Sequence, residues 1–215
     1  MVFQIKGERM DKKDLRTRLL KKTKQQIDEN LSLKEVQIIR AIRLIDDLEE
    51  INNLMKENLA ECEKRAPEEK EQKMISTLST NQNAIEEEKK ELTTFITEEL
   101  SAELPTFTLI ATPLIGARLL AEAGSKRKLA FCPSSTMQVL GAEKALFSHI
   151  KKKTSCPKHG HIFNHPFLQR LPKPKRGKAA RILAGKLSIA ARMDYFGKTL
   201  DKELLKEVET KIKKL

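Results

Sequence analysis

The sequence predicts an all-α protein in which an antiparallel coiled-coil hairpin is followed by a compact helical domain. Apolar residues recur every three or four positions through the first half of the chain, which is the helical period. Hydrophobic residues make up 39% of the 215 residues and are chiefly Leu, Ile and Ala, with no Trp and one Tyr, a composition that favours helices over sheets. The length suits one large domain, or one domain plus an extension without its own core.

Residues 1–30 are predicted to form a charged N-terminal helix. Between Asp11 and Asn30 the charges are many and the apolar positions few. We expect this helix to be solvated and to pack only through Leu15, Leu19, Leu20 and Ile27.

Residues 31–104 are predicted to form the coiled-coil arm. Ser32, with Glu35 three residues on, is a capping box that would begin a helix of about 28 residues and about 40 Å. This helix needs a partner because its apolar residues are spaced by threes and fours and share one stripe. The stripe consists of Ile38, Ile42, Ile45, Leu48, Ile51, Met55 and Leu59.

The partner helix is expected after a break near Cys62–Pro67, since Pro67 fits a first helical turn. Its apolar positions are Met74, Leu78, Ile85, Leu92, Phe95 and Leu100. The two helices would fold back on each other as an antiparallel hairpin. Ser79–Asn83 is a polar gap, and Asn83 with Glu86 forms a second capping box, so the alternative is a helix that restarts there.

The composition changes at Pro105, and residues 105–198 are predicted to form the second domain. Residues 106–124 are mostly small and apolar, residues 135–150 and 177–196 have the pattern of helices, and residues 151–176 are expected to be loop-like. A last charged helix is predicted within residues 199–215. No internal repeat is found.

The charge is divided between the two halves of the chain. The net charge is +12, but residues 1–104 hold 19 basic against 23 acidic residues, whereas residues 105–198 hold 18 basic residues and only Glu122, Glu143 and Asp194. Such a basic segment favours a polyanion as partner, with nucleic acid first and an anionic membrane surface second. A membrane is not favoured, because there is no apolar run of about 18 residues, and the charged N-terminus is no signal peptide.

The cysteine and histidine content predicts neither a disulfide framework nor a metal site. Three separated cysteines indicate an intracellular protein with reduced thiols, and the expected location is the cytoplasm. Zinc would accept the four closely spaced ligands Cys156, His159, His161 and His165, but a structural zinc site usually draws pairs from two separated elements, and no second pair exists. We expect these imidazoles to pack or hydrogen-bond within the loop, or to contact RNA. No cofactor is predicted.

The sequence does not indicate an enzyme. It has no Gly-rich phosphate loop, nucleophile elbow or HExxH run. Glu143 beside Lys144 is interpreted as a buried pair or as a polar contact at an interface, and not as a catalytic dyad.

Basic residues gather in three clusters, Lys126–Lys128, Lys151–Lys153 and Lys173–Arg181. If they converge on one face they form an electrostatic footprint for nucleic acid, because each neutralised phosphate releases counterions. The alternative is that these lysines only keep the domain soluble.

Several runs of the second half resemble the Nop domain of archaeal and eukaryotic box C/D ribonucleoprotein core proteins and of their splicing-factor relative. The matching runs are Ile115–Ser125, Pro133–Phe147 with GAEKALF at 141–147, Pro157–Phe163, Arg176–Arg181 and Asp194–Phe196. In the arm, IIRAIRLIDDLEEIN at 38–52 resembles the family's first coiled-coil helix, so the resemblance covers roughly residues 30–198.

The resemblance implies a non-catalytic scaffold of an archaeal cell that recognises a kink-turn RNA together with a small ribosomal-protein-like partner already bound to it. It implies that Gln138, Glu143 and Lys144 face that protein and the RNA. The RNA-binding residues are expected to be Lys158, His159, Arg176, Lys178 and Arg181, with the cluster Lys151, Lys152 and Lys153. It also implies self-association, or pairing with a paralogue, through the arm.

Two departures from the family pattern concern the partners. Family members in guide complexes carry an N-terminal domain that binds fibrillarin, whereas only a charge-rich stretch of about 30 residues precedes the arm here, and the tip of the arm lacks an aromatic-rich stretch. The chain is either a fragment or a minimal homologue, and fibrillarin binding is in doubt in both cases. The competing hypothesis is a coiled-coil oligomerisation protein whose basic domain binds any polyanion.

Overall fold

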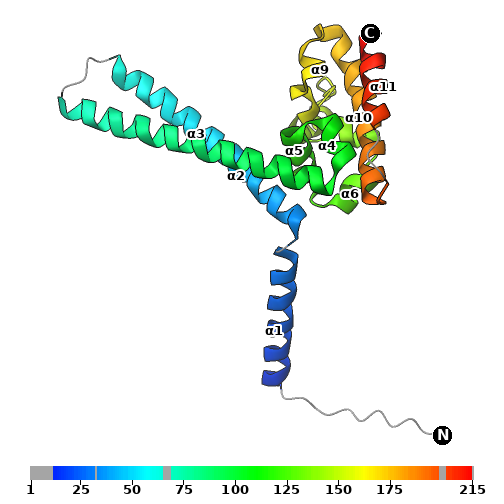
Figure 1. The fold of residues 1–215 in the computed structure, drawn as a ribbon, viewed down its shortest axis with the longest axis horizontal. Coiled ribbons are helices and arrows are strands. Elements are labelled where there is room, and N and C mark those ends of the chain that lie inside the picture. Colours follow the sequence, from blue (N-terminus) through cyan, green and yellow to red (C-terminus); the bar gives the residue numbers. More distant parts are fainter. Residues whose placement is uncertain (1–11, 32, 65–68, 199–201, 215) are drawn as a thin grey trace.

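The computed structural model describes residues 12–31, 33–64, 69–198 and 202–214, with the backbone alone described at some helix ends. These residues form helices joined by turns and contain no strand, which confirms the predicted all-α class (Figure 1). The elements are α1 (Lys12–Leu31), α2 (Lys34–Glu63), α3 (Glu69–Glu103), α4 (Pro105–Ala111), α5 (Pro113–Ala123), α6 (Lys126–Phe131), α7 (Ser134–Val139), α8 (Glu143–Lys152), the 3₁₀-helix η1 (His161–Asn164), α9 (Pro166–Gln169), α10 (Lys173–Tyr195) and α11 (Lys202–Lys213).

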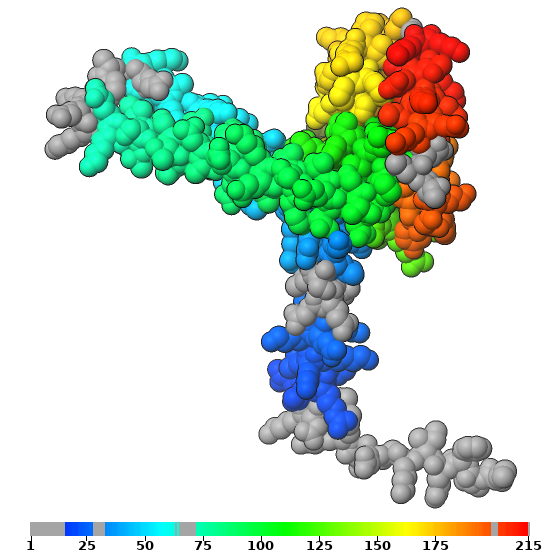
Figure 2. Space-filling view, viewed as in Figure 1, coloured from blue at the N-terminus to red at the C-terminus, as the bar shows by residue number. Residues whose placement is uncertain are grey.

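Helices α2 and α3 form an antiparallel hairpin whose far end stands clear of the body (Figures 1 and 2). Its root belongs to the main core, since Ile38, Ile42 and Ile45 of α2 are buried with residues of α3 and the body. The predicted stripe is wrong at Ile51, which is exposed. Asn52 is buried in the hairpin instead, and its side-chain amide donates a hydrogen bond to the Glu86 carboxylate of α3.

Helix α3 runs unbroken from Glu69 to Glu103, so the alternative of a restart at Asn83 is wrong. Hydroxyl groups in and beside the polar gap bond back to the helix itself. Thr77 Oγ1 donates to the Lys73 carbonyl at 2.9 Å and Thr80 Oγ1 donates to the Ser76 carbonyl at 2.9 Å. These side chains therefore satisfy their polar groups without breaking the helix.

The start of α2 differs from the predicted capping box. Ser32 lies outside the described residues, and Leu33 occupies the N-cap position without a side-chain bond to the helix. Glu35 does not reach back to that position. Its Oε2 accepts a hydrogen bond of 2.8 Å from the backbone N–H of Lys126, so it ties the arm to the start of α6.

Two further contacts fix the arm to the body. Arg118 of α5 donates from Nε to Asp46 Oδ1 at 3.0 Å, and its Nη2 lies 3.3 Å from Glu49 Oε2. Lys126 pairs with Glu103 at the end of α3. The described side chains of α1 behave differently, because Leu19, Leu20 and Ile27 are exposed and do not pack as predicted.

Helix α10 packs against α4, α6, α7 and α11. Its Asp194 accepts hydrogen bonds from the backbone N–H groups of Thr106 at 3.2 Å and Phe107 at 2.7 Å, in the first turn of α4. Helices α4 and α5 meet at Thr112, where φ is 70°. In the described ranges no single helix is long and apolar enough to cross a membrane, although α4 and α5, bent by 114°, pass that test together.

The helix predicted for residues 135–150 is divided into α7 and α8. Gly141 has a φ of +84°, a conformation that ends α7, and a Cβ at this position would lie 2.3 Å from the His161 ring. The loop-like prediction for residues 151–176 is also wrong in part, because this segment contains η1, α9 and the first turn of α10. Helix α10 begins at Lys173, since Pro174 is tolerated in a first helical turn.

The predicted C-terminal helix is present as α11. Leu204, Val208 and Ile212 are its buried face and pack against the core. Lys186 of α10 pairs with Glu207 of α11.

Candidate nucleic-acid interface

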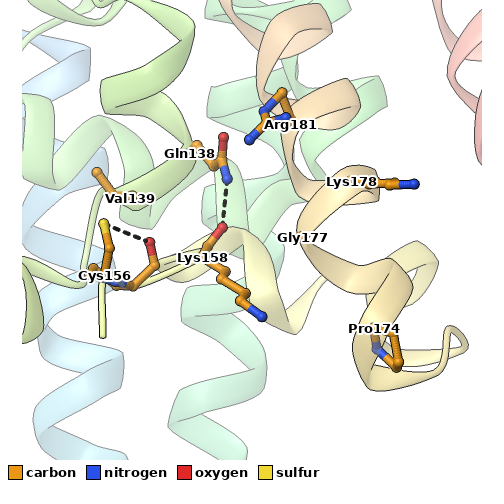
Figure 3. Close-up of a pocket in the computed structure, with 9 residues that line it drawn as sticks. Gln138, Val139, Cys156, Lys158, Pro174, Gly177, Lys178 and Arg181 are labelled. Atoms are coloured by element: carbon orange, nitrogen blue, oxygen red, sulfur yellow. Dashed lines mark hydrogen bonds between the residues drawn. The ribbon is translucent and has the colours of Figure 1, made fainter. Parts of the chain in front are cut away.

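An open pocket of about 510 Å³ lies between α7, the segment after α8 and the N-terminal half of α10 (Figure 3). It is lined by Gln138, Val139, Cys156, Pro157, Lys158, Pro174, Gly177, Lys178 and Arg181. Four of these are residues that the sequence predicted for the site, namely Gln138, Lys158, Lys178 and Arg181. They are up to 43 positions apart in the chain, so only the fold brings them together.

Backbone and side-chain hydrogen bonds hold the pocket's two walls together. Gln138 Nε2 donates to the Lys158 carbonyl at 2.6 Å, and the Gly160 N–H donates to the Gln138 carbonyl at 2.9 Å. A Cβ at Gly160 would lie 1.8 Å from the Leu140 carbonyl oxygen, so this close approach of two backbones requires glycine. The position of the Lys158 backbone is therefore fixed by α7.

The pocket is positively charged, since Lys158, Lys178 and Arg181 line it and none of its lining residues is acidic. Arg181 points toward Gln138, whereas Lys178 points outward from α10 (Figure 3). All three cations belong to exposed residues. A guanidinium and two ammonium groups around one hollow suit phosphate oxygens, because they supply charge-assisted donors from several directions.

Arg176 and His159 lie beside the pocket but are engaged within the protein. Arg176 donates from Nε to the Leu171 carbonyl at 2.8 Å, and its guanidinium lies 5.4 Å from the centre of the Phe163 ring. His159 stacks on the same ring with centroids 4.5 Å apart. Burial lowers the pKa of His159, and the nearby charges of Arg176 and Lys158 lower it further. These two residues support the wall of the pocket.

The remaining predicted residues lie on α8 or at its C-cap and do not line the pocket. Glu143 and Lys144 are both exposed, so they are not a buried pair. Glu143 Oε1 accepts a hydrogen bond of 2.8 Å from the Gly141 N–H and so stabilises the turn that begins α8. Lys151, Lys152 and Lys153 are exposed at the other end of the helix, where Lys153 has a φ of 52°.

Helix α8 has no fully buried residue, and two of its large apolar side chains are left in solvent while Leu146 is partly buried. Phe147 is 60% exposed and Ile150 is 66% exposed, three residues apart and therefore on neighbouring positions of one face. Neither residue was among those predicted from the sequence for the site. The alternation of apolar and basic residues between Glu143 and Lys152 is the signal that could have identified an amphipathic helix without an internal partner.

The cysteine and histidine residues considered for zinc are dispersed. His165 is buried, its Nε2 donates to the Ile110 carbonyl at 2.9 Å, and its Nδ1 accepts from the Phe167 N–H at 3.2 Å. Burial lowers the pKa of His165. His161 Nε2 lies 3.3 Å from Glu122 Oε1 of α5. Within the described part of the chain, no group of three His, Cys, Asp or Glu residues is placed to hold a metal ion.

A cation-lined pocket next to an exposed amphipathic helix, on a helical body that carries a hairpin arm, is an arrangement that suits a nucleic-acid-binding scaffold. The chain belongs to the Nop family, whose sequence model is described as "snoRNA binding domain, fibrillarin" and matches residues 17–214. This confirms the resemblance inferred from the GAEKALF run.

Relatives are found in archaea and eukaryotes. An uncharacterized NOP5 family protein of Methanocaldococcus jannaschii is 46% identical over 133 residues, which are 62% of this chain and 32% of that protein. Nucleolar protein 56 of Homo sapiens is 39% identical over 122 residues, which are 57% of this chain and 20% of that protein. The matched region is therefore only about a third to a fifth of these relatives.

A similar fold occurs in a solved structure whose title is "Crystal structure of fibrillarin/Nop5p complex". The TM-score is 0.69 and the sequence identity 28%, and the similarity covers 94% of this chain and 78% of the solved one. The arm and the body of this chain thus share their arrangement with a known protein of the same family.

Proposed function

We propose that this chain is a non-catalytic scaffold that binds a kink-turn RNA of the box C/D type together with a small ribosomal-protein-like partner already bound to that RNA. One observation carries the proposal: the cation-lined pocket and the unburied helix α8 adjoin each other, and the turn at Gly141 joins them. A surface with one cationic and one amphipathic part suits a ligand with an RNA and a protein component. We expect it to act in the cytoplasm of an archaeal cell.

The pocket is the part proposed to contact RNA. Its cations Lys158, Lys178 and Arg181 are exposed, so they can neutralise phosphates without first leaving an internal ion pair. Arg176 and His159 are proposed to act mainly by holding Phe163 and the loop in place. Lys151–Lys153 extend the positive surface along α8.

Helix α8 is the part proposed to contact the protein component. A short helix that buries none of its side chains gains little stability from its own fold, and burial of Phe147 and Ile150 in an interface would remove apolar surface from water. Lys144 and the second carboxylate oxygen of Glu143, at its start, are available for polar contacts at the rim of that interface. A pocket that suits RNA and a helix that suits a protein together support recognition of a composite surface.

The arm is proposed to mediate self-association or pairing with a paralogue. Leu44, Ile51 and Leu54 are exposed on α2, and their spacing of seven and three residues puts them on one face of the helix. The hairpin therefore presents apolar surface that its own two helices do not cover.

The test is the affinity of the full chain for a kink-turn RNA alone and for the same RNA loaded with its protein. We expect weak binding to the naked RNA and much tighter binding to the loaded one. Phe147→Ala should weaken only the loaded complex, whereas Lys178→Ala should weaken both. Equal affinity for the two ligands would contradict composite recognition.

A competition assay at moderate salt distinguishes specific recognition from the rival hypothesis of general polyanion binding. A specific scaffold retains the loaded kink-turn RNA in the presence of excess unstructured RNA, whereas a general polyanion binder exchanges one for the other.

A further inference from the structure

Three aromatic rings form an exposed cluster at the end of α10 that is remote from the pocket. Phe131 ends α6, and Tyr195 and Phe196 end α10. The ring centroids are 5.3 to 6.2 Å apart and the interplanar angles are 71° to 82°, so each pair packs edge to face. Exposed fractions are 60% for Phe131, 39% for Tyr195 and 63% for Phe196. The chain has only nine aromatic residues, and three of them are left in solvent here.

The cluster is built on fixed elements. Arg192 donates from Nε to the Ala130 carbonyl at 3.0 Å, and Ser188 Oγ donates to the Cys132 carbonyl at 3.0 Å, so the ends of α6 and α10 are bonded to each other on both sides of Phe131. The rings are therefore held in place, and a ligand would not have to order them first.

An open face of α10 connects this cluster with the pocket. The residues along it are spaced by three or four positions and so share one side of the helix: Lys178, Arg181, Gly185, Ile189, Arg192 and Phe196. All are exposed except Gly185, which is partly buried, and a Cβ at Gly185 would meet nothing within 4 Å. Helix α10 has 23 residues, which corresponds to about 34 Å between its ends.

The charge around the cluster matches an anionic ligand. Arg192 and Lys198 are exposed next to Tyr195 and Phe196, and Arg127 lies one turn before Phe131 on the same face of α6. The acidic residue nearest in sequence is Asp194, whose two oxygens are occupied by backbone N–H groups of α4. A ligand that carries both negative charge and flat apolar rings fits this surface, and single-stranded nucleic acid has both.

We propose that Phe131, Tyr195 and Phe196 form a stacking platform for unpaired RNA bases, reached by a strand that runs from the pocket along the open face of α10. The inference rests on the proposed function in so far as the ligand belongs to the same RNA. It adds a second contact surface that reads unpaired nucleotides by stacking and not by phosphate contact alone.

Tyr195 is a built-in reporter for the test, because the chain has no other Tyr and no Trp. The full chain is titrated with a single-stranded adenine oligoribonucleotide and, separately, with inorganic polyphosphate, which has the charge but no bases. We expect the oligoribonucleotide to quench Tyr195 fluorescence and polyphosphate to leave it nearly unchanged. Equal quenching by both, or none by the oligoribonucleotide, overturns the platform.

Leucine variants test whether the aromatic rings themselves bind the oligoribonucleotide. Phe131→Leu and Phe196→Leu should each weaken binding of the labelled oligoribonucleotide by about fivefold or more, the loss expected for one stacked base. Met74→Ala is the control, since Met74 is also an exposed apolar residue, at 50%, but lies on α3 in the arm, and this variant should bind normally. Thermal melting of each variant verifies that it is folded.

Binding of a second ligand shows whether a failure concerns the stacking platform or the proposed function. Phe131→Leu should bind a protein-loaded kink-turn RNA without unpaired extensions as tightly as the unmodified chain does. Weaker binding of that ligand would assign the cluster to the protein partner and overturn the platform. If Phe131→Leu keeps full affinity for the oligoribonucleotide, the platform fails while composite recognition stands. If no cation variant of the pocket weakens the loaded RNA, the proposed function fails instead.

Discussion

The cations at the start of α10 have two different roles: two are exposed and can bind RNA, and one stabilises the fold. Substitutions of these neighbouring residues should therefore have different effects on RNA affinity and on stability. Lys178 and Arg181 are exposed at the pocket, whereas Arg176 donates to the Leu171 carbonyl and packs on Phe163. The double variant Lys178→Ala with Arg181→Ala should lose RNA affinity and keep its stability within about 0.5 kcal/mol. Arg176→Ala should lose about 2 kcal/mol of unfolding free energy, from a hydrogen bond with a charged donor and a cation–π contact.

The size of the RNA effect follows from counterion release. Each neutralised phosphate adds about 0.7 to 0.9 to the slope of log affinity against log salt concentration. Removing two contacts should therefore flatten the slope by about 1.4 to 1.8. With a slope of about 0.8 per contact, lowering the salt from about 1 M to about 50 mM strengthens RNA binding by about tenfold for each contact. Loss of one cation should therefore remove about tenfold of this gain in affinity, and loss of both about a hundredfold.

The assay is fluorescence anisotropy with labelled, protein-loaded kink-turn RNA over a series of salt concentrations. Chemical denaturation of the same preparations gives the unfolding free energies. Lys206→Ala is the matched control, because Lys206 is exposed on α11, away from the pocket. An unchanged salt slope in the double variant, or a loss no greater than that of the control, would refute the assignment of these two cations.

Three further predictions concern the fold that holds the site. Gly185→Ala should raise the unfolding free energy by about 0.5 to 1 kcal/mol in thermal or chemical melts, because the helix gains a better former in open space; Gly116→Ala, whose Cβ would meet a core side chain at 3.0 Å, should not. Gly141→Ala should cost about 2 kcal/mol or more, since φ is +84° and the His161 ring occupies the Cβ position, and an undiminished melting temperature would contradict this. Burial lowers the pKa of His165 in the folded chain, whereas the unfolded chain has the ordinary value of about 6.5. Below about pH 6.5 the unfolded state therefore binds a proton more readily than the folded state does. The unfolding free energy should fall as the pH falls from about 6.5 toward the folded pKa. Denaturation at about pH 7.5 and about pH 5.5 should show this loss, and His165→Gln should reduce it.

The sequence predicted the parts of the fold that depend on periodicity. The arm follows from the spacing of apolar residues in α2 and α3, because that signal is local, and the change in composition at Pro105 coincides with the start of α4. Periodicity did not reveal that Ile51 is exposed and Asn52 buried, since the rotation of a helix against its partner depends on which side chains it meets there.

The site could be predicted only as a set of candidates. Motif matching selected residues that the fold does bring to one pocket, but it could not distinguish Arg181, which is exposed, from Arg176, whose guanidinium is used by the chain itself. That distinction depends on Phe163 and the Leu171 carbonyl, which α9 and η1 place beside α10. The turn at Gly141 was missed for a similar reason, because the ring that requires a glycine there belongs to His161, twenty residues away.

Amide hydrogen exchange of α8 tests the central claim most directly. In the free chain this helix buries no side chain, so we expect its amides to exchange quickly. Addition of the protein-loaded kink-turn RNA should slow exchange in α8 and around the pocket, whereas naked RNA should slow it around the pocket alone. Unchanged exchange in α8 with the loaded RNA, or equal slowing with naked RNA, would contradict the account.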